Sequence, residues 1–275
     1  MACPFGYLLQ HGLGLEELTL ASEPDDAREL GQLYHEILAR FYGELADTGA
    51  RFRSDALPRY RARMEEIADE CYRKHRGMIP DIVYLANREV WSRIARRLLE
   101  NDALLIDGHV PLLIEGRRET AALVPGVLIV ARIDRVTRAP DDTLALVDYK
   151  KSRLPDKKEI NAGSPEPTGG GAEEVDLLGS VQIPLYVSLL ESEGERVGGA
   201  GFYSLERGEY RALFGNTGGG GKPSMVRERM DEILRLTFDR VNEMVNRINR
   251  GDFTCGARCD GCPMQGICRT GFAVQ

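Results

Sequence analysis

The chain has 275 residues, of which 43% are hydrophobic, and it carries a formal net charge of −7 at neutral pH. This length allows one large domain with a substantial core, or two small ones, so a soluble globular protein is expected. The sequence lacks the run of about 18 apolar residues that a membrane span needs, and its start lacks the basic and then apolar order of a secretory signal. We therefore expect a cytoplasmic protein rather than a membrane-spanning or secreted one.

The negative charge bears on whether the partner is a nucleic acid. Phosphate binding is driven by Lys and Arg side chains that displace counterions, so an acidic chain argues mildly against it. Net charge says little about one groove, however, and a basic face can lie on an acidic protein. Candidates for such a face are Arg51, Arg53, Arg59, Arg61, Arg63, Arg88, Arg93, Arg96 and Arg97. For any one of them, the favoured alternative is an ordinary solvated helix surface.

Helical periodicity dominates the first hundred residues. Apolar residues recur on one helix face between positions 27 and 45. His35 lies outside this apolar arc, on the same side as Gly31 one turn earlier. Arg-rich helical patterns then continue to about residue 100, with interruptions near Pro58 and at 77–80.

The pattern then changes to short runs rich in β-branched residues. Val127–Val136 and Leu144–Lys151 are predicted to pair as a hairpin through a turn at 139–143, and Val110–Ile114 is a candidate neighbouring strand. The remaining segments are predicted to be a loop at 161–171, a helix at Leu177–Leu190, a strand at Gly199–Leu205, a loop at 216–223 and a long helix at about Ser224–Asn249.

Three polar residues of the predicted hairpin suggest metal chemistry. Asp148 and Lys150 are two residues apart and so point to the same face of the sheet, and Asp134 lies on the preceding strand. Carboxylates on neighbouring strands suit Mg²⁺ or Mn²⁺, which prefer oxygen ligands. A lysine beside them can orient an attacking water or stabilise phosphate charge. The competing interpretation of this weak motif is a surface strand with an ion pair.

A second polar pair lies downstream, in the helix predicted over Leu177–Leu190. Gln182 and Tyr186 are four residues apart and share one helix face. Taken alone, such a pair is usually a partly buried polar edge.

The cysteines predict a metal or cluster site. Six cysteines in a cytosolic chain favour metal or redox chemistry over disulfides. Cys259, Cys262 and Cys268 form a C-x2-C-x5-C pattern, which strongly indicates thiolate ligation of zinc or an iron–sulphur cluster. The fourth ligand is either Cys255 or Cys3, and Cys3 would join the two ends of the chain. Cys71 lies in an ordinary helical pattern.

Together these motifs resemble the nuclease domain of the AddB type, among the RecB-like PD-(D/E)xK nucleases that carry an iron–sulphur staple. The resemblance covers nearly the whole chain and rests on six motifs in the family's order. They are Cys3-Pro4-Phe5-Gly6-Tyr7 followed by Leu13-Gly14-Leu15, the G-x-x-x-H of Gly31 to His35, Arg132-Ile133-Asp134-Arg135-Val136, Val147-Asp148-Tyr149-Lys150, the Q-x-x-x-Y of Gln182 to Tyr186, and the C-x2-C-x5-C pattern. The chain departs from the family where Ala131 replaces the usual glycine, where Thr137 replaces a frequent aspartate, and where the 261–264 segment lacks the common aromatic.

The resemblance implies a fold. It is an α/β fold with a PD-(D/E)xK, restriction-endonuclease-like core, in which a small mixed sheet is flanked by helices and a helical insertion. The whole chain, 1–275, would form one nuclease domain, with a largely helical part at 26–105, the catalytic sheet and Q-x-x-x-Y helix at 106–205, and the last helix and cysteine cluster at 224–275. An iron–sulphur cluster would join the termini. Because the chain begins at the first cysteine motif, we expect a fragment of a helicase–nuclease or a small stand-alone relative.

The resemblance also implies roles for single residues. His35, Asp134, Asp148 and the backbone carbonyl of Tyr149 would hold Mg²⁺ or Mn²⁺, and Lys150 would position the attacking water. Gln182 and Tyr186 would hold the DNA strand. Cys3, Cys259, Cys262 and Cys268 would bind a 4Fe–4S cluster.

The implied activity is that of a deoxyribonuclease, expected to act as an exonuclease on DNA ends during recombinational repair. A helicase–nuclease subunit of the AddA type is the expected partner. The alternatives are a non-catalytic DNA-binding module stabilised by an iron–sulphur or zinc site, and a structural zinc protein.

Overall fold

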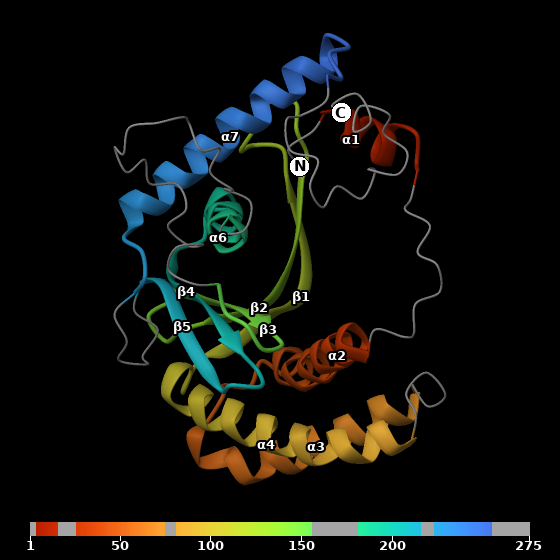
Figure 1. Ribbon diagram of the computed structural model, residues 1–275. Coiled ribbons are helices and arrows are strands. Elements are labelled where there is room, and N and C mark those ends of the chain that lie inside the picture. The colour runs from red at the N-terminus through yellow and green to blue at the C-terminus, as the bar shows by residue number, and fades with distance from the viewer. Residues whose placement is uncertain (1–3, 16–25, 75–80, 156–180, 216–222, 255–275) are drawn as a thin grey trace, which may run out of the picture. The chain divides into compact units, whose positions relative to one another are not determined.

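The computed structural model describes residues 4–15, 26–74, 81–155, 181–215 and 223–254 (Figure 1). The chain divides into two compact units, one covering 25–234 and the other combining 1–24 with 235–275. Three predicted segments lie wholly or partly outside the described residues: the loop at 161–171, the loop at 216–223 up to residue 222, and the first residues of the helix predicted from Leu177. Within the described ranges, no helix has both the length and the apolar character that a membrane crossing requires.

Three long helices form one layer of the larger unit. They are α2 (Asp26–Asp47), α3 (Leu57–Lys74) and α4 (Asp81–Leu105), and a short 3-10 turn, Ser54–Ala56, precedes α3. The helical periodicity of the sequence predicted all three. Pro58 lies in the first turn of α3, where its missing N–H has no intrahelical partner to lose, so the predicted break precedes this helix.

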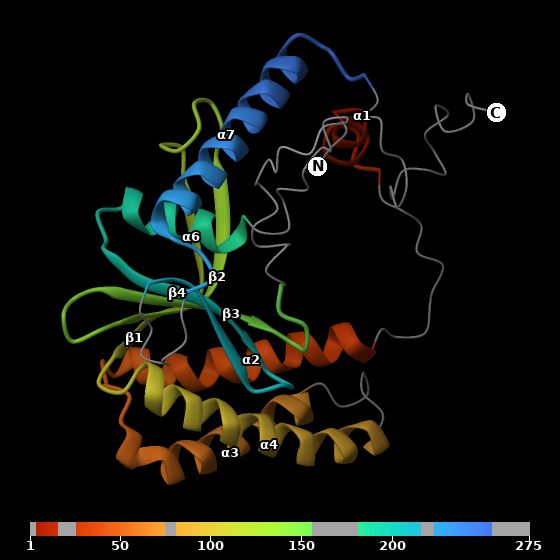
Figure 2. The ribbon, with the colours of Figure 1, turned by 60° about the vertical axis from the view of Figure 1, so that its left-hand side comes forward.

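A five-stranded sheet forms the second layer, in the order β1 (Val110–Thr120), β2 (Ile129–Arg138), β3 (Leu144–Lys150), β4 (Val197–Ser204) and β5 (Glu209–Gly215). Among the described residues β3 and β4 form the one parallel pair, so the sheet is mixed, as the family resemblance implied. The parallel pair requires a crossover connection, which contains helix α6 (Gln182–Ser192). Helices α2, α3 and α4 cover one face of the sheet and α6 the other (Figure 2).

The β2–β3 hairpin confirms the predicted turn. The backbone N–H of Ala139 donates to the carbonyl of Thr143 at 2.8 Å, and Asp142 adopts a φ of +68°. Aspartate tolerates this left-handed conformation better than most residues. Because the turn fixes the register, Val147 lies opposite Arg135, and the carboxylates of the two strands fall at the same end of the hairpin.

Two strands differ from the prediction. β1 continues to Thr120 rather than ending near Ile114, and β5 has no counterpart in the predicted elements. Both are edge strands, each with one neighbouring strand among the described residues. Edge strands often carry charged residues, which interrupt the alternation of apolar and polar residues that identifies a strand in a sequence. The polar ends of β1 and β5 therefore look like loops in the sequence.

The other described helices are α7 (Arg227–Asn249), α1 (Pro4–Tyr7) and a π-helical turn at Leu8–Gly12. The predicted long C-terminal helix is thus confirmed, with a start three residues later than expected. Helix α7 begins in the larger unit, where Met230, Ile233 and Leu234 are buried.

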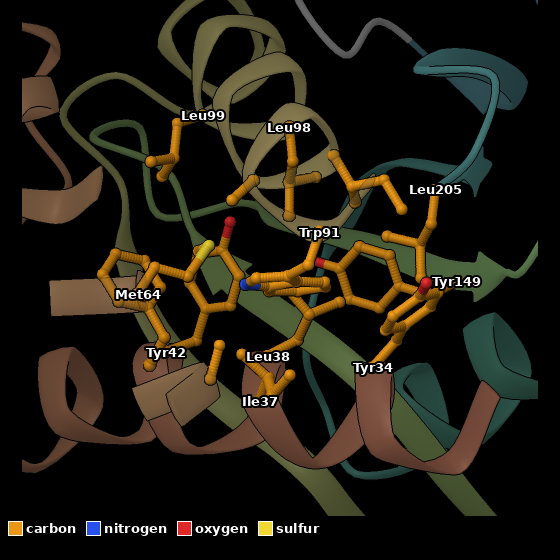
Figure 3. Packing of buried hydrophobic residues seen from close by; sticks show 14 of the residues in the cluster. Tyr34, Ile37, Leu38, Tyr42, Met64, Trp91, Leu98, Leu99, Tyr149 and Leu205 are labelled. Atoms are coloured by element: carbon orange, nitrogen blue, oxygen red, sulfur yellow. The ribbon is translucent and has the colours of Figure 1, made fainter. Parts of the chain in front are cut away.

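The main core lies between the helical layer and the sheet and is rich in aromatic residues (Figure 3). Tyr34 of α2 and Trp91 of α4 pack with their ring centroids 5.2 Å apart. Tyr149 of β3 is buried in the same cluster, and so is Cys71 of α3, which agrees with its position in a helical pattern. The residue after Asp148 is therefore anchored in the core, which fixes the strand that carries the candidate site.

A buried ion pair links α4 to the hairpin. The side chains of Arg135 and Asp102 are only 1% and 0% exposed, and Arg135 Nη2 donates to Asp102 Oδ1 at 2.9 Å. Asp102 also accepts a hydrogen bond from the Tyr42 hydroxyl, and the Arg135 guanidinium lies 4.4 Å from the centroid of the Tyr42 ring. Both charges are compensated by several partners, as burial requires.

We expect Asp102→Ala to lower the free energy of unfolding by about 3–5 kcal/mol, because the Arg135 charge stays buried without its partner. Chemical denaturation would measure the change. The double variant Asp102→Leu with Arg135→Met removes both charges and should recover most of the loss. An equal loss in both variants would show that the pair itself, rather than the orphaned charge, carries the stability.

Candidate metal centre

The candidate site is assembled from five elements of the larger unit. Helix α2 contributes His35, and the neighbouring strands β1 and β2 contribute acidic side chains. Strand β3 contributes Asp148 and Lys150, and α6 contributes the polar pair Gln182 and Tyr186 from its first two turns. The polar side chains fall into two groups.

The first group is a three-residue cluster around His35. His35 Nδ1 lies 2.8 Å from Glu115 Oε1 and 3.7 Å from Asp134 Oδ1. One donor atom from each of the three residues lies within 4.8 Å of the other two. An imidazole and two carboxylates at this separation form a donor set that suits a divalent cation.

Sequence reasoning missed Glu115. This residue has a φ of +48° and lies in β1 between the paired residues Ile114 and Gly116, alongside Asp134 on the neighbouring strand. A Cβ added at Gly116 would come within 2.0 Å of the Leu113 side chain, which would have to move. The only sequence signal was an acidic residue before a glycine in an apolar run, and this is too common to single out.

The second group runs from β3 to α6. Lys150 Nζ lies 2.8 Å from Asp148 Oδ2 and 2.9 Å from Gln182 Oε1. The amide nitrogen of Gln182 then lies 2.8 Å from the Tyr186 hydroxyl. The structure thus brings four predicted site residues into one polar chain.

A backbone contact connects the two groups. The N–H of Tyr149 donates to Asp134 Oδ2 at 2.7 Å, so this carboxylate is held by β3 while its other oxygen faces His35. Among the described residues, Asp148 is not a member of the three-residue cluster around His35. Its predicted role as a ligand, like the roles of His35 and Asp134, therefore stays a prediction.

Burial and charge crowding shift the pKa values of the acids. Burial, reinforced by the charge of Asp148, raises the pKa of Asp134 to about 7. Burial also raises the pKa of Asp148, although the nearby Lys150 opposes the shift. Acids held so close together are poorly neutralised by the protein alone, which is typical of a site that accepts a cation.

The acidic neighbours also shift the pKa of the His35 imidazole. Burial lowers the pKa of His35, but the hydrogen bond to Glu115 and the charge of Asp134 outweigh it, so the pKa is raised. The ring is therefore held by its acidic neighbours when no cation competes for them.

Solvent reaches the cluster through an open cavity of about 650 Å³. His35 and Glu115 line it, and so do the basic side chains of Arg132 and Lys151. The Cβ position of Gly31, one turn before His35, meets open space on this side. A cation at the cluster would therefore be accessible to an anionic substrate, with basic groups nearby.

The arginines proposed as a basic face fall into two groups, those that make ion pairs with acidic side chains and those that are exposed. Several make ion pairs, such as Arg61 with Glu65, Arg63 with Glu44 and Arg88 with Asp69. Arg59, Arg93, Arg96 and Arg97 are exposed. The paired residues fit the interpretation of an ordinary helix surface better than that of a DNA-binding face.

The predicted cluster ligands cannot be placed. Cys3, Cys259, Cys262 and Cys268 lie outside the described residues, and so does the alternative ligand Cys255. The iron–sulphur site therefore stays a prediction.

Comparison with known proteins identifies the protein family that the chain matches. Residues 1–269 match the family model described as the PD-(D/E)XK nuclease superfamily. None of the curated proteins compared with the chain matches it.

Proposed function

The chain belongs to the PD-(D/E)XK nuclease superfamily, and on this basis we propose that it is a Mg²⁺- or Mn²⁺-dependent deoxyribonuclease. The observation that carries the proposal is the arrangement of His35 and Asp134, from distant parts of the chain, beside the Asp148–Lys150 pair. We further propose that it cuts linear DNA as an exonuclease in end processing and recombinational repair, with a helicase–nuclease partner of the AddA type. The six family-like motifs of the sequence support this finer assignment.

The residues of the candidate site would have different roles in phosphodiester hydrolysis. His35, Asp134, Asp148 and the carbonyl of Tyr149 would hold the divalent ion, which supplies charge to polarise the scissile phosphate and to acidify a water. Lys150 is held between Asp148 and Gln182, and its side chain is 31% exposed, so it can orient that water and offset phosphate charge. Gln182 and Tyr186 would hold the DNA strand. The reaction forms one P–O bond to the water oxygen and breaks one P–O ester bond.

Lys150→Ala tests this assignment. We expect the rate of linear-DNA cleavage in Mg²⁺ to fall about a hundredfold, because a preorganised group that stabilises transition-state charge is lost. Mn²⁺ binding measured by calorimetry should change little, because lysine is not a ligand. The matched control is Lys74→Ala, since Lys74 is an exposed lysine at the end of α3, 2.8 Å from Glu36, and does not line the cavity. Unchanged cleavage in Lys150→Ala would contradict the catalytic role, and lost Mn²⁺ binding would contradict the division of roles.

We also propose that Cys3, Cys259, Cys262 and Cys268 bind a 4Fe–4S cluster that joins the ends of the chain. The C-x2-C-x5-C spacing supports thiolate ligation, and the resemblance of Cys3-Pro4-Phe5-Gly6-Tyr7 to the family's first-cysteine motif supports a link between the ends. A visible spectrum of anaerobically purified protein separates the cluster, which is brown, from zinc, which is colourless.

A further inference from the structure

We propose that Glu115 is an additional ligand of the divalent cation, and that cation binding withdraws Glu115 from Arg132, whose guanidinium then binds a DNA phosphate. The inference rests on the proposed nuclease function and adds a metal ligand and a substrate contact to it.

Glu115 is a partly buried member of the three-residue cluster and contacts His35 directly. Its side chain is only 15% exposed, and its Oε1 lies 2.8 Å from His35 Nδ1. Its backbone has a φ of +48°, a left-handed conformation that is unfavourable for a non-glycine residue and is often retained where function requires it. This backbone places the carboxylate within 4.8 Å of the donor atoms of His35 and Asp134, which is the separation expected of ligands that share one ion.

Arg132 competes for the same carboxylate. Its Nε lies 2.8 Å from Glu115 Oε2, although 72% of the Arg132 side chain is exposed. Because water solvates the Arg132 side of this pair, the contact contributes less than a fully buried ion pair would, so it can be exchanged at small cost. A divalent cation between Glu115, His35 and Asp134 would take up the negative charge that now neutralises the guanidinium.

The released guanidinium would be well placed for a phosphate. Arg132 and Asp134 are two residues apart on β2, so their side chains leave the same face of the sheet. Arg132 also lines the open cavity that reaches His35 and Glu115. The guanidinium is planar and forms paired hydrogen bonds with phosphate oxygens, so a DNA backbone in this cavity has a partner beside the cation.

The competing explanation is that Glu115 only orients the His35 ring. Carboxylates that hydrogen-bond to a metal-binding histidine can affect metal affinity without touching the ion. That role would not require Arg132, so it predicts no dependence between cation binding and the contact of Arg132 with DNA. The two roles are therefore separated by measuring both partners of the Glu115–Arg132 pair.

The first measurement is Mn²⁺ affinity by calorimetry. Glu115→Gln keeps a hydrogen-bond acceptor for His35 but removes the charge, and we expect its Mn²⁺ affinity to fall at least about tenfold. Arg132→Gln removes the competitor and should bind Mn²⁺ as tightly as the native chain or more tightly. The control is Glu119→Gln, on the same strand and paired with Arg117. If Glu115→Gln folds poorly, Glu115→Asp keeps the charge but shortens the reach, and it should also lose affinity.

The second measurement is the binding of a single-stranded DNA oligonucleotide by fluorescence anisotropy, in EDTA and in Ca²⁺, over a range of salt concentrations. For the native protein we expect the slope of log affinity against log salt to steepen by about 0.7 in Ca²⁺, the value of one added phosphate contact. Arg132→Gln should not show this steepening. The control Arg117→Gln, from the exposed pair on β1, should keep it.

Two results would overturn the inference without touching the proposed function. They are native Mn²⁺ affinity in Glu115→Gln while Asp134→Asn loses it, and a Ca²⁺-dependent salt slope that persists in Arg132→Gln. Native Mn²⁺ affinity in Asp134→Asn would instead contradict the proposed metal site itself.

Discussion

Asp148→Asn is expected to lower the rate of linear-DNA cleavage in Mg²⁺ by about a thousandfold or more, with the protein still folded. A thousandfold loss corresponds to about 4 kcal/mol of transition-state stabilisation, the scale of a lost charge interaction with the metal and Lys150. The side chain is only 1% exposed, and asparagine has nearly the same shape, so packing should be kept. Initial cleavage rates measure the effect, and circular dichroism melting verifies the fold.

Asp142→Asn is the matched control for this variant. Asp142 is 72% exposed, lies in the turn of the same hairpin and has a φ that asparagine also tolerates. Its cleavage rate should remain native. Native cleavage in Asp148→Asn as well would remove Asp148 from the catalytic site.

The predicted part of the site follows from local rules. The two-residue spacing of Asp148 and Lys150 fixes their common face wherever the strand lies, and the four-residue spacing of Gln182 and Tyr186 does the same on a helix. The shared face of each pair holds in any fold that keeps the strand or the helix, because it depends only on the backbone geometry of that element. In the structure the two pairs meet, because Lys150 contacts both Asp148 and Gln182.

The missed part depends on contacts between distant segments. Glu115 joins the cluster through a left-handed backbone conformation in an edge strand, which no periodic pattern reveals. Arg135 and Asp102 would be read as surface charges from the sequence, yet they are buried because each supplies the other's partner across 33 positions. The strand β5 was missed for a related reason, since an edge strand with one unpaired side carries polar residues.

Cys3→Ser is expected to have the largest effect on stability. If Cys3 is the fourth cluster ligand, the cluster closes a loop of almost the whole chain and restricts the unfolded state by roughly 4–5 kcal/mol, by analogy with disulfides. That is comparable with the whole stability of a domain, about 5–15 kcal/mol. The variant should therefore lose the brown colour, and its melting temperature should fall sharply.

Two other cysteines serve as controls for Cys3→Ser. Cys255→Ser should keep the colour and the melting temperature, because the resemblance assigns Cys255 no ligand role. Cys71→Ser should keep the colour too, but Cys71 is fully buried in the core of α3, so this variant is expected to lose some stability on packing grounds alone. Iron content and colour, rather than melting temperature, therefore distinguish a ligand from a core cysteine. Loss of iron in Cys255→Ser with retention in Cys3→Ser would mean a compact C-terminal metal site, and the link between the chain ends would have to be withdrawn.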